Sequence, residues 1–188
     1  ASGGEHLISH YLDSVAYSAD RHPAMHGEQV ALGTLISSAL YEKLLEVDAE
    51  QIDVNKLTVN YPAWPDREKR IKTTHGDLTP LVMPYAREKY IPKEQYRKRL
   101  QRIIQHWPDL TAHIKTNLQP TDQIRSAYTH AGTPTKASDI NVSDDLIKRA
   151  YIGARDVRTR YTALDLAWEL GLLEELENDV FERSGVLG

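Results

Sequence analysis

Histidines are concentrated at the start of this chain, and imidazole is the side chain best suited to metal binding or proton transfer near neutral pH. Four of the eight histidines lie within the first 26 of the 188 residues. His6 and His10 are four residues apart, which places both side chains on one face of a helix. The motif is weak by itself, because a solvated polar face gives the same spacing.

His26 stands at the predicted start of the following helix. A short antiparallel connection between two helices would bring His26 back towards His6 and His10. Three imidazoles at one place could hold a divalent metal, with Asp13 and Glu28 as partners for the outer ring nitrogens. Alternatively His26 only caps a helix, since the chain offers no obvious fourth ligand for a closed zinc site.

The elements that must position these side chains are helical. Apolar residues recur at i, i+3 and i+4 over residues 7–15, and residues 27–47 are apolar round most of the helix. We therefore predict a first helix that buries the face opposite His6 and His10, and a buried central second helix. Further helices are predicted over 65–74, 93–106, 110–118, 122–131, 144–152, 157–172 and 172–181.

No segment shows the alternation of a β-strand, so the predicted fold class is all-α, a single multi-helix bundle over residues 1–188. Three prolines fall within residues 79–92, where we expect a broken segment with only a short turn over 85–90.

Composition and charge exclude several function classes. With 27 acidic and 23 basic residues, the net charge of −4 argues against nucleic acid or an anionic membrane as the main partner. The basic run at 97–99 is then interpreted as a solvated face. No apolar stretch is long enough to span a bilayer, and we expect a cytoplasmic protein. Because the chain has no cysteine, any metal must be held by histidine and carboxylate.

Two parts of the chain resemble the helical C-terminal domain of the sn-glycerol-1-phosphate dehydrogenases. The early part is SGGEHLISHYLD over residues 2–13 followed by HGEQVALGT over 26–34. The late part is AGTP over 131–134 and RTRYTALDLA over 158–167, which is similar to the bacterial branch. The family belongs to the superfamily of glycerol dehydrogenase, iron-dependent alcohol dehydrogenases and dehydroquinate synthase. The resemblance therefore implies a dehydroquinate synthase-like C-terminal fold.

The resemblance also assigns roles to the three histidines. His6 and His26 match the two histidine ligands of a divalent metal, zinc or nickel. His10 matches a histidine that contacts the substrate near the metal, and it is the expected catalytic residue. The third ligand, an aspartate, and the NAD(P) site would lie in a Rossmann-like N-terminal domain that is absent from this chain.

By the same resemblance, we expect the chain to be part of a longer enzyme of phospholipid metabolism that interconverts dihydroxyacetone phosphate and glycerol 1-phosphate. No glycine-rich dinucleotide turn occurs in these residues, which fits that interpretation. The expected partners are a small phosphorylated triol or ketone and the N-terminal domain of the same polypeptide. A homodimer is left open as the assembly, and this part alone is expected to be inactive.

Three alternatives stay open at this stage. The enzyme could be a glycerol dehydrogenase or a dehydroquinate synthase-like protein, or the chain could be a non-catalytic helical module that binds a metal or a partner. The residues that hold a substrate phosphate are also open. Arg155, Arg158 and Arg160 could form a clamp, but exposed salt bridges to Asp156 and Asp165 are the favoured interpretation.

Overall fold

The computed structural model describes residues 3–188, and within that range every regular element is a helix. The predicted all-α fold class is therefore confirmed. The α-helices are α1 Gly4–Ser18, α2 His26–Leu45, α3 Val54–Asn60, α4 Trp64–His75, α5 Thr79–Lys89, α6 Lys93–Gln105, α7 Trp107–Asn117, α8 Thr121–His130, α9 Asp144–Gly153, α10 Ala163–Glu169 and α11 Glu177–Ser184. None of the helices in this range is long and apolar enough to cross a membrane.

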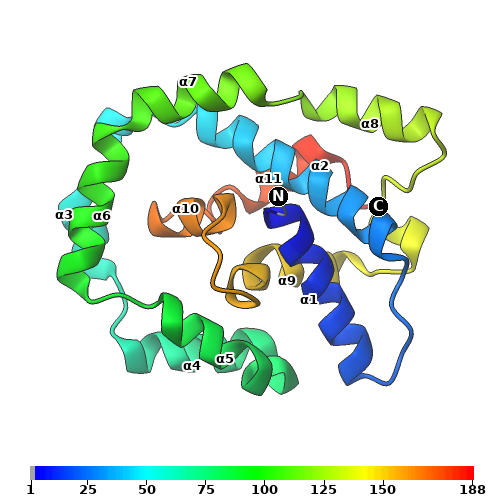
Figure 1. Ribbon diagram of the computed structural model, residues 1–188, viewed down its shortest axis with the longest axis horizontal. Coiled ribbons are helices and arrows are strands. Elements are labelled where there is room, and N and C mark those ends of the chain that lie inside the picture. The colour runs from blue at the N-terminus through cyan, green and yellow to red at the C-terminus, as the bar shows by residue number, and fades with distance from the viewer. Residues whose placement is uncertain (1–2) are drawn as a thin grey trace.

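Helices α1 and α2 pack directly against each other (Figure 1). As predicted, α1 buries one apolar face, made of Leu7, Ile8, Tyr11 and Leu12. The two helices lie close together at Gly33, where an added Cβ would lie 2.5 Å from the carbonyl oxygen of Glu5. A side chain at position 33 would therefore push apart the two helices that carry the histidines.

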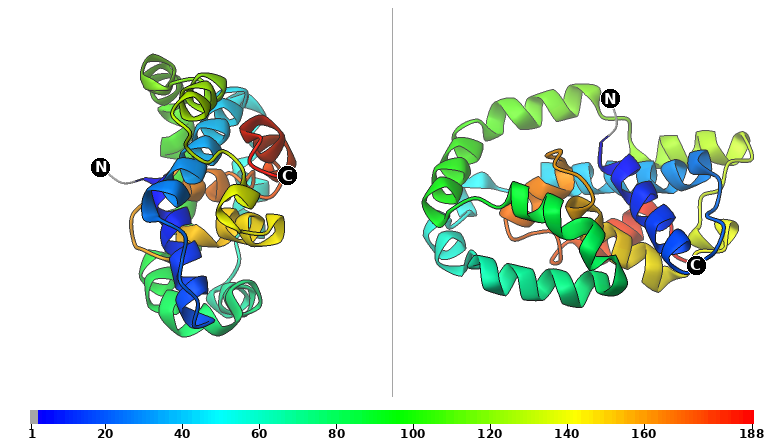
Figure 2. Two further views of the ribbon diagram at one scale, coloured as in Figure 1. Left: turned by 90° about the vertical axis from the view of Figure 1, so that its right-hand side faces the viewer. Right: turned by 60° about the horizontal axis from the view of Figure 1, so that its bottom comes forward.

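The remaining helices lie round α10 and beside this pair. Helices α3 to α7 curve round α10, as Figure 1 and the right-hand view of Figure 2 show, and α9 and α11 pack against α1 and α2 respectively. The central helix α2 buries eleven of its twenty residues, which agrees with the prediction that it is the buried central helix.

The prediction of a broken segment over 79–92 is wrong, because α5 runs unbroken from Thr79 to Lys89. Pro80 lies in the first turn, where its missing N–H is not needed. Pro84 forfeits only the bond to the carbonyl of Pro80. Burial of Val82 and Ala86 on the core offsets that loss.

The long helix predicted over 157–172 is also wrong. Residues 154–156 form a 3-10 turn, residues 157–162 are not helical, and α10 begins only at Ala163. The carboxylate of Asp165 accepts a 2.9 Å hydrogen bond from the backbone N–H of Thr162, which caps the new helix there. The apolar residues over 157–172 keep a helical spacing on both sides of Thr162, so the spacing did not reveal that a new helix begins there. The short helix α3 was not predicted at all.

Candidate functional site

The three histidines singled out from the sequence come together in the structure. His6 and His10 project from α1, and His26 begins α2 after the connection of residues 19–25 reverses the chain. The ring centres of His6 and His26 are 5.4 Å apart, those of His10 and His26 5.8 Å, and those of His6 and His10 6.4 Å. We call these three residues the histidine cluster. The predicted return of His26 to the first helix is confirmed.

The histidine cluster lies at the surface. The side chains of His6 and His10 are 34% and 38% exposed, and His26 is exposed as well. The opposite face of α1 is buried, as the apolar stripe predicted. A ligand can therefore reach all three rings from outside this chain.

Each ring has an oxygen atom near its Nδ1 atom. His6 Nδ1 lies 3.1 Å from a carboxylate oxygen of Glu5, and His26 Nδ1 lies 3.0 Å from the hydroxyl of Ser9. His10 Nδ1 is 4.0 Å from the carboxylate of Asp13. Outer partners of this kind orient metal-binding imidazoles and leave the Nε2 atom for the ligand.

The sequence identified only one of these outer partners. Asp13 was named, whereas Glu5 and Ser9 were missed. Glu28, the other residue named, makes no hydrogen bond or ion pair with the three histidines in residues 3–188. Helical spacing could have indicated Ser9, because Ser9 lies one turn beyond His6 on the same helix and so near the place where His26 was expected to return.

The donor set suits a borderline metal such as zinc or nickel, since both accept imidazole nitrogen. Within residues 3–188, however, no three His, Cys, Asp or Glu side chains are already arranged to hold a metal ion. The resemblance places only two ligands in this chain and a third elsewhere in the polypeptide, so it does not require a complete set here.

The pKa of His10 is lowered from its ordinary value, first by partial burial and then by the positive charge of Arg158. The ring is therefore mainly neutral at pH 7, a form that can both donate and accept a hydrogen bond. Arg158 itself is exposed, with its guanidinium 5.4 Å from the ring of Tyr85 and one N–H donated to the carbonyl of Val157.

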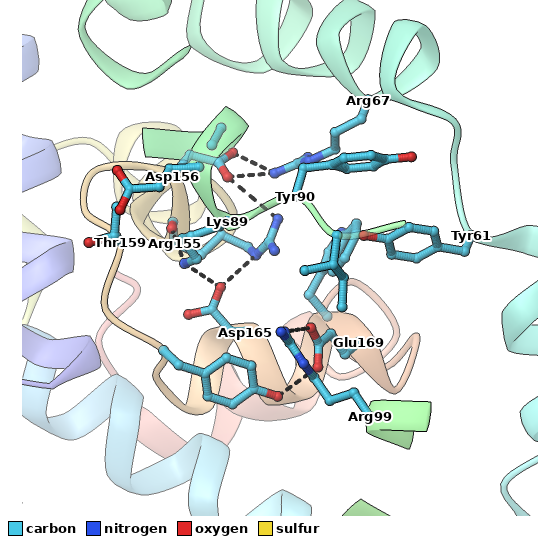
Figure 3. Close-up of a pocket in the computed structure, with 15 residues that line it drawn as sticks. Tyr61, Arg67, Lys89, Tyr90, Arg99, Arg155, Asp156, Thr159, Asp165 and Glu169 are labelled. Carbon is cyan, nitrogen blue, oxygen red and sulfur yellow. Dashed lines mark hydrogen bonds and ion pairs between the residues drawn. The ribbon is translucent and has the colours of Figure 1, made fainter. Parts of the chain in front are cut away.

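A second group of charged side chains lies deeper, around a cavity of about 230 Å³ (Figure 3). Arg67 donates to both carboxylate oxygens of Asp156, at 2.5 and 2.8 Å, and His75 lies 3.1 Å from the same group. Burial alone would raise the pKa of Asp156, but Arg155, His75 and Arg67 together hold that pKa well below its usual range.

The other half of this group is centred on Asp165. Its carboxylate lies 2.5 Å from the ammonium of Lys89 and 3.3 Å from the Nε atom of Arg155. The Nη1 atom of Arg155 also lies 3.5 Å from the carboxylate of Asp156. We call Arg67, Lys89, Arg155, Asp156 and Asp165 the buried charge cluster. Arg155 does pair with Asp156 and Asp165, as the favoured interpretation expected, but the prediction that these salt bridges are exposed is wrong, because all three side chains are buried by tertiary packing.

The fold and the site thus define an all-α protein with three surface histidines gathered at the junction of its first two helices. In sequence, the chain is related to the glycerol-1-phosphate dehydrogenases, which confirms the resemblance. It is 46% identical over 84 residues to glycerol-1-phosphate dehydrogenase [NAD(P)+] of Archaeoglobus fulgidus, a match that covers 44% of this chain. It is 24% identical over 164 residues, 87% of the chain, to the protein of that name in Halalkalibacterium halodurans.

A third relative of the same name, from Bacillus licheniformis, is 21% identical over 177 residues, which is 94% of this chain. The matched stretches cover 22%, 31% and 31% of the three relatives, so each match spans less than a third of the relative's length. No protein-family profile matches the chain, and no solved structure matches it.

Proposed function

We propose that this chain is the metal- and substrate-binding helical domain of an NAD(P)-dependent sn-glycerol-1-phosphate dehydrogenase. The observation that carries the proposal is the convergence of His6, His10 and His26 in a chain related to enzymes of that name. The dinucleotide site and an aspartate ligand would belong to the remainder of the polypeptide. The reaction is the interconversion of dihydroxyacetone phosphate and glycerol 1-phosphate.

In this proposal His6 and His26 hold a divalent metal, zinc or nickel. Their Nδ1 atoms are engaged with Glu5 and Ser9, so the Nε2 atoms are the ones available as ligands. When bound, such a metal supplies a Lewis acid that polarises the oxygen on C2 of the substrate.

His10 acts on the substrate itself. Its ring is mainly neutral and lies beside the two ligands, so it can hydrogen-bond the C2 oxygen and take up or return the hydroxyl proton. A nicotinamide held by the rest of the polypeptide would supply or accept the hydride at C2, and this domain would hold the substrate in place for that transfer.

Arg158 is our candidate for the substrate's phosphate group. It is exposed, and it follows the 3-10 turn of residues 154–156, which packs against α1. It is also close enough to His10 for its positive charge to lower the pKa of that ring. Arg155 is unsuitable, because both of its carboxylate partners lie inside the buried charge cluster. Arginine can bind a phosphate with two parallel hydrogen bonds.

The test is an assay of the complete polypeptide with dihydroxyacetone phosphate and NADH or NADPH, together with its metal content. We expect His6→Ala and His26→Ala each to abolish metal retention and turnover. His113→Ala, at an exposed histidine of α7, is the matched control and should leave both unchanged. Retention of metal and rate by either variant, or activity on unphosphorylated glycerol alone, would contradict the proposal.

A further inference from the structure

A continuous chain of hydrogen bonds leads from Asp13 through Gln29 and Ser9 to His26. Gln29 Nε2 lies 3.0 Å from Asp13 Oδ1, Gln29 Oε1 lies 2.8 Å from Ser9 Oγ, and Ser9 Oγ lies 3.0 Å from His26 Nδ1. Ser9 is fully buried and Gln29 is 1% exposed, so water does not compete for these contacts. The chain joins the start of α2 to the first three turns of α1.

The amide of Gln29 can take only one orientation. One end of the amide faces the carboxylate of Asp13 and, at 3.1 Å, the backbone carbonyl of Ala24. A carboxylate and a carbonyl only accept hydrogen bonds, so the NH₂ group must occupy that end. The amide oxygen is therefore directed at Ser9, where it can only accept.

The orientation of the Gln29 amide also fixes which atom donates in the contact between Ser9 and His26. Ser9 has one hydroxyl hydrogen, and it donates that hydrogen to Gln29 Oε1. The contact between Ser9 and His26 consequently requires His26 Nδ1 to be the donor. In the neutral ring, a proton on Nδ1 leaves Nε2 with an unshared electron pair.

We propose that Ser9, Gln29 and Asp13 are positioning residues that fix the tautomer of His26, so that its Nε2 atom is ready to bind a metal before the metal arrives. This inference rests on the proposed function for its purpose, whereas the direction of the hydrogen bonds stands on geometry alone. Neither Ser9 nor Gln29 would touch the substrate, so they would act only through His26.

Two variants interrupt the chain at different links. Ser9→Ala removes the acceptor for His26 Nδ1, which frees the proton to move to Nε2. Gln29→Met keeps Ser9 but removes its acceptor, so the hydroxyl can turn and donate to Nδ1 instead. Loss of such an outer contact weakens metal binding by about 10–100-fold, and we expect a loss of that size from both variants. Ser37→Ala is the matched control, because Ser37 is a buried serine of α2 whose hydroxyl has no hydrogen-bond partner within residues 3–188.

The experiment uses the metal-free complete polypeptide with ¹⁵N-labelled histidine. Long-range ¹H–¹⁵N NMR at about pH 8 reports which ring nitrogen of His26 carries the proton. Titration with Zn²⁺ then gives the affinity. We expect the wild type and Ser37→Ala to hold the proton on Nδ1, and Ser9→Ala and Gln29→Met to place part of it on Nε2 and bind zinc more weakly.

The wild-type spectrum decides the question even if a variant fails to fold. A wild-type His26 with its proton on Nε2 would overturn the proposal, and so would unchanged tautomer and zinc affinity in folded Ser9→Ala. A wild type with the proton on Nδ1 that bound no zinc would support the hydrogen-bond chain and contradict the proposed function instead.

Discussion

The histidine cluster and the buried charge cluster each bring ionisable side chains together in one place, but the two clusters differ in which groups complete their contacts. In the buried charge cluster, the carboxylates of Asp156 and Asp165 are surrounded by cations of this chain, and those side chains are at most 11% exposed. In the histidine cluster the rings are accessible, and their contacts with protein oxygen are made through Nδ1.

This difference separates a structural role from a binding role. Charges that neutralise one another in the interior hold loops and helices together and offer little to a ligand. Imidazole rings whose Nδ1 atoms contact protein oxygen and whose Nε2 atoms remain accessible are suited to bind a ligand such as a metal ion. Substitutions in the buried charge cluster should therefore lower stability, whereas substitutions in the histidine cluster should weaken binding.

The largest effect on stability is expected from Arg67→Ala. Removing one partner of a buried ion pair leaves the other charge uncompensated, which costs about 3–5 kcal/mol of unfolding free energy. Arg70→Ala is the matched control on the same helix, because Arg70 pairs with Glu174 where both side chains are about half exposed. That variant should lose less than about 1 kcal/mol in urea denaturation. Equal losses would refute the distinction between buried and exposed pairs.

Gly33→Ala should have the next largest effect. The added Cβ would collide with the backbone of Glu5, and overpacking of this kind costs about 1–3 kcal/mol. Because Gly33 sets the spacing of α1 and α2, the variant should also weaken zinc binding by the histidine cluster. Gly27→Ala is the control, since a Cβ there meets no atom of the described part of the chain within 4 Å. The account would be contradicted if the two variants had the same denaturation midpoint.

A further prediction concerns acid. The folded-state pKa of Asp156 is held well below its value in the unfolded chain, about 3.9. Its contribution to stability is therefore fully present above about pH 4 and is lost as the pH falls through the folded-state pKa. Asp156→Asn should be less stable at neutral pH and should lose less stability on acidification below pH 4, as measured by urea denaturation. Parallel pH profiles for wild type and variant would contradict this.

The smallest effect on stability is expected from Arg158→Ala. Arg158 is exposed, so the unfolding free energy should change by no more than about 0.5 kcal/mol. If it binds the substrate's phosphate, the variant should raise KM for dihydroxyacetone phosphate several-fold with little change in kcat. An unchanged KM would show that the phosphate is held elsewhere.

The sequence predicted the histidine cluster well because both of its causes are local. The spacing of His6 and His10 follows from the helix period, and the short connection before His26 leaves few ways for the chain to return. The outer partners were harder to predict, since Ser9 and Gln29 are ordinary polar residues until the two helices are packed.

The buried charge cluster was largely invisible in the sequence. Arg67 falls within the helix predicted over 65–74, and Asp156 lies 89 positions further along the chain. The pair is defined by tertiary packing, for which periodicity carries no signal. The failed predictions over 79–92 and 157–172 also concern features that periodicity does not reveal. Packing on the core keeps α5 helical through Pro84, and a local cap at Thr162 begins a new helix inside the segment predicted as one helix.

The central claim is that the histidine cluster is a ligand site rather than a structural one. It is tested most directly by calorimetric titration of the metal-free complete polypeptide with Zn²⁺, with urea denaturation of the same samples. The account predicts zinc binding by the wild type, no detectable binding by His6→Ala or His26→Ala, and metal-free unfolding free energies within about 0.5 kcal/mol of one another. Unchanged zinc affinity in either variant, or a large loss of metal-free stability, would contradict it.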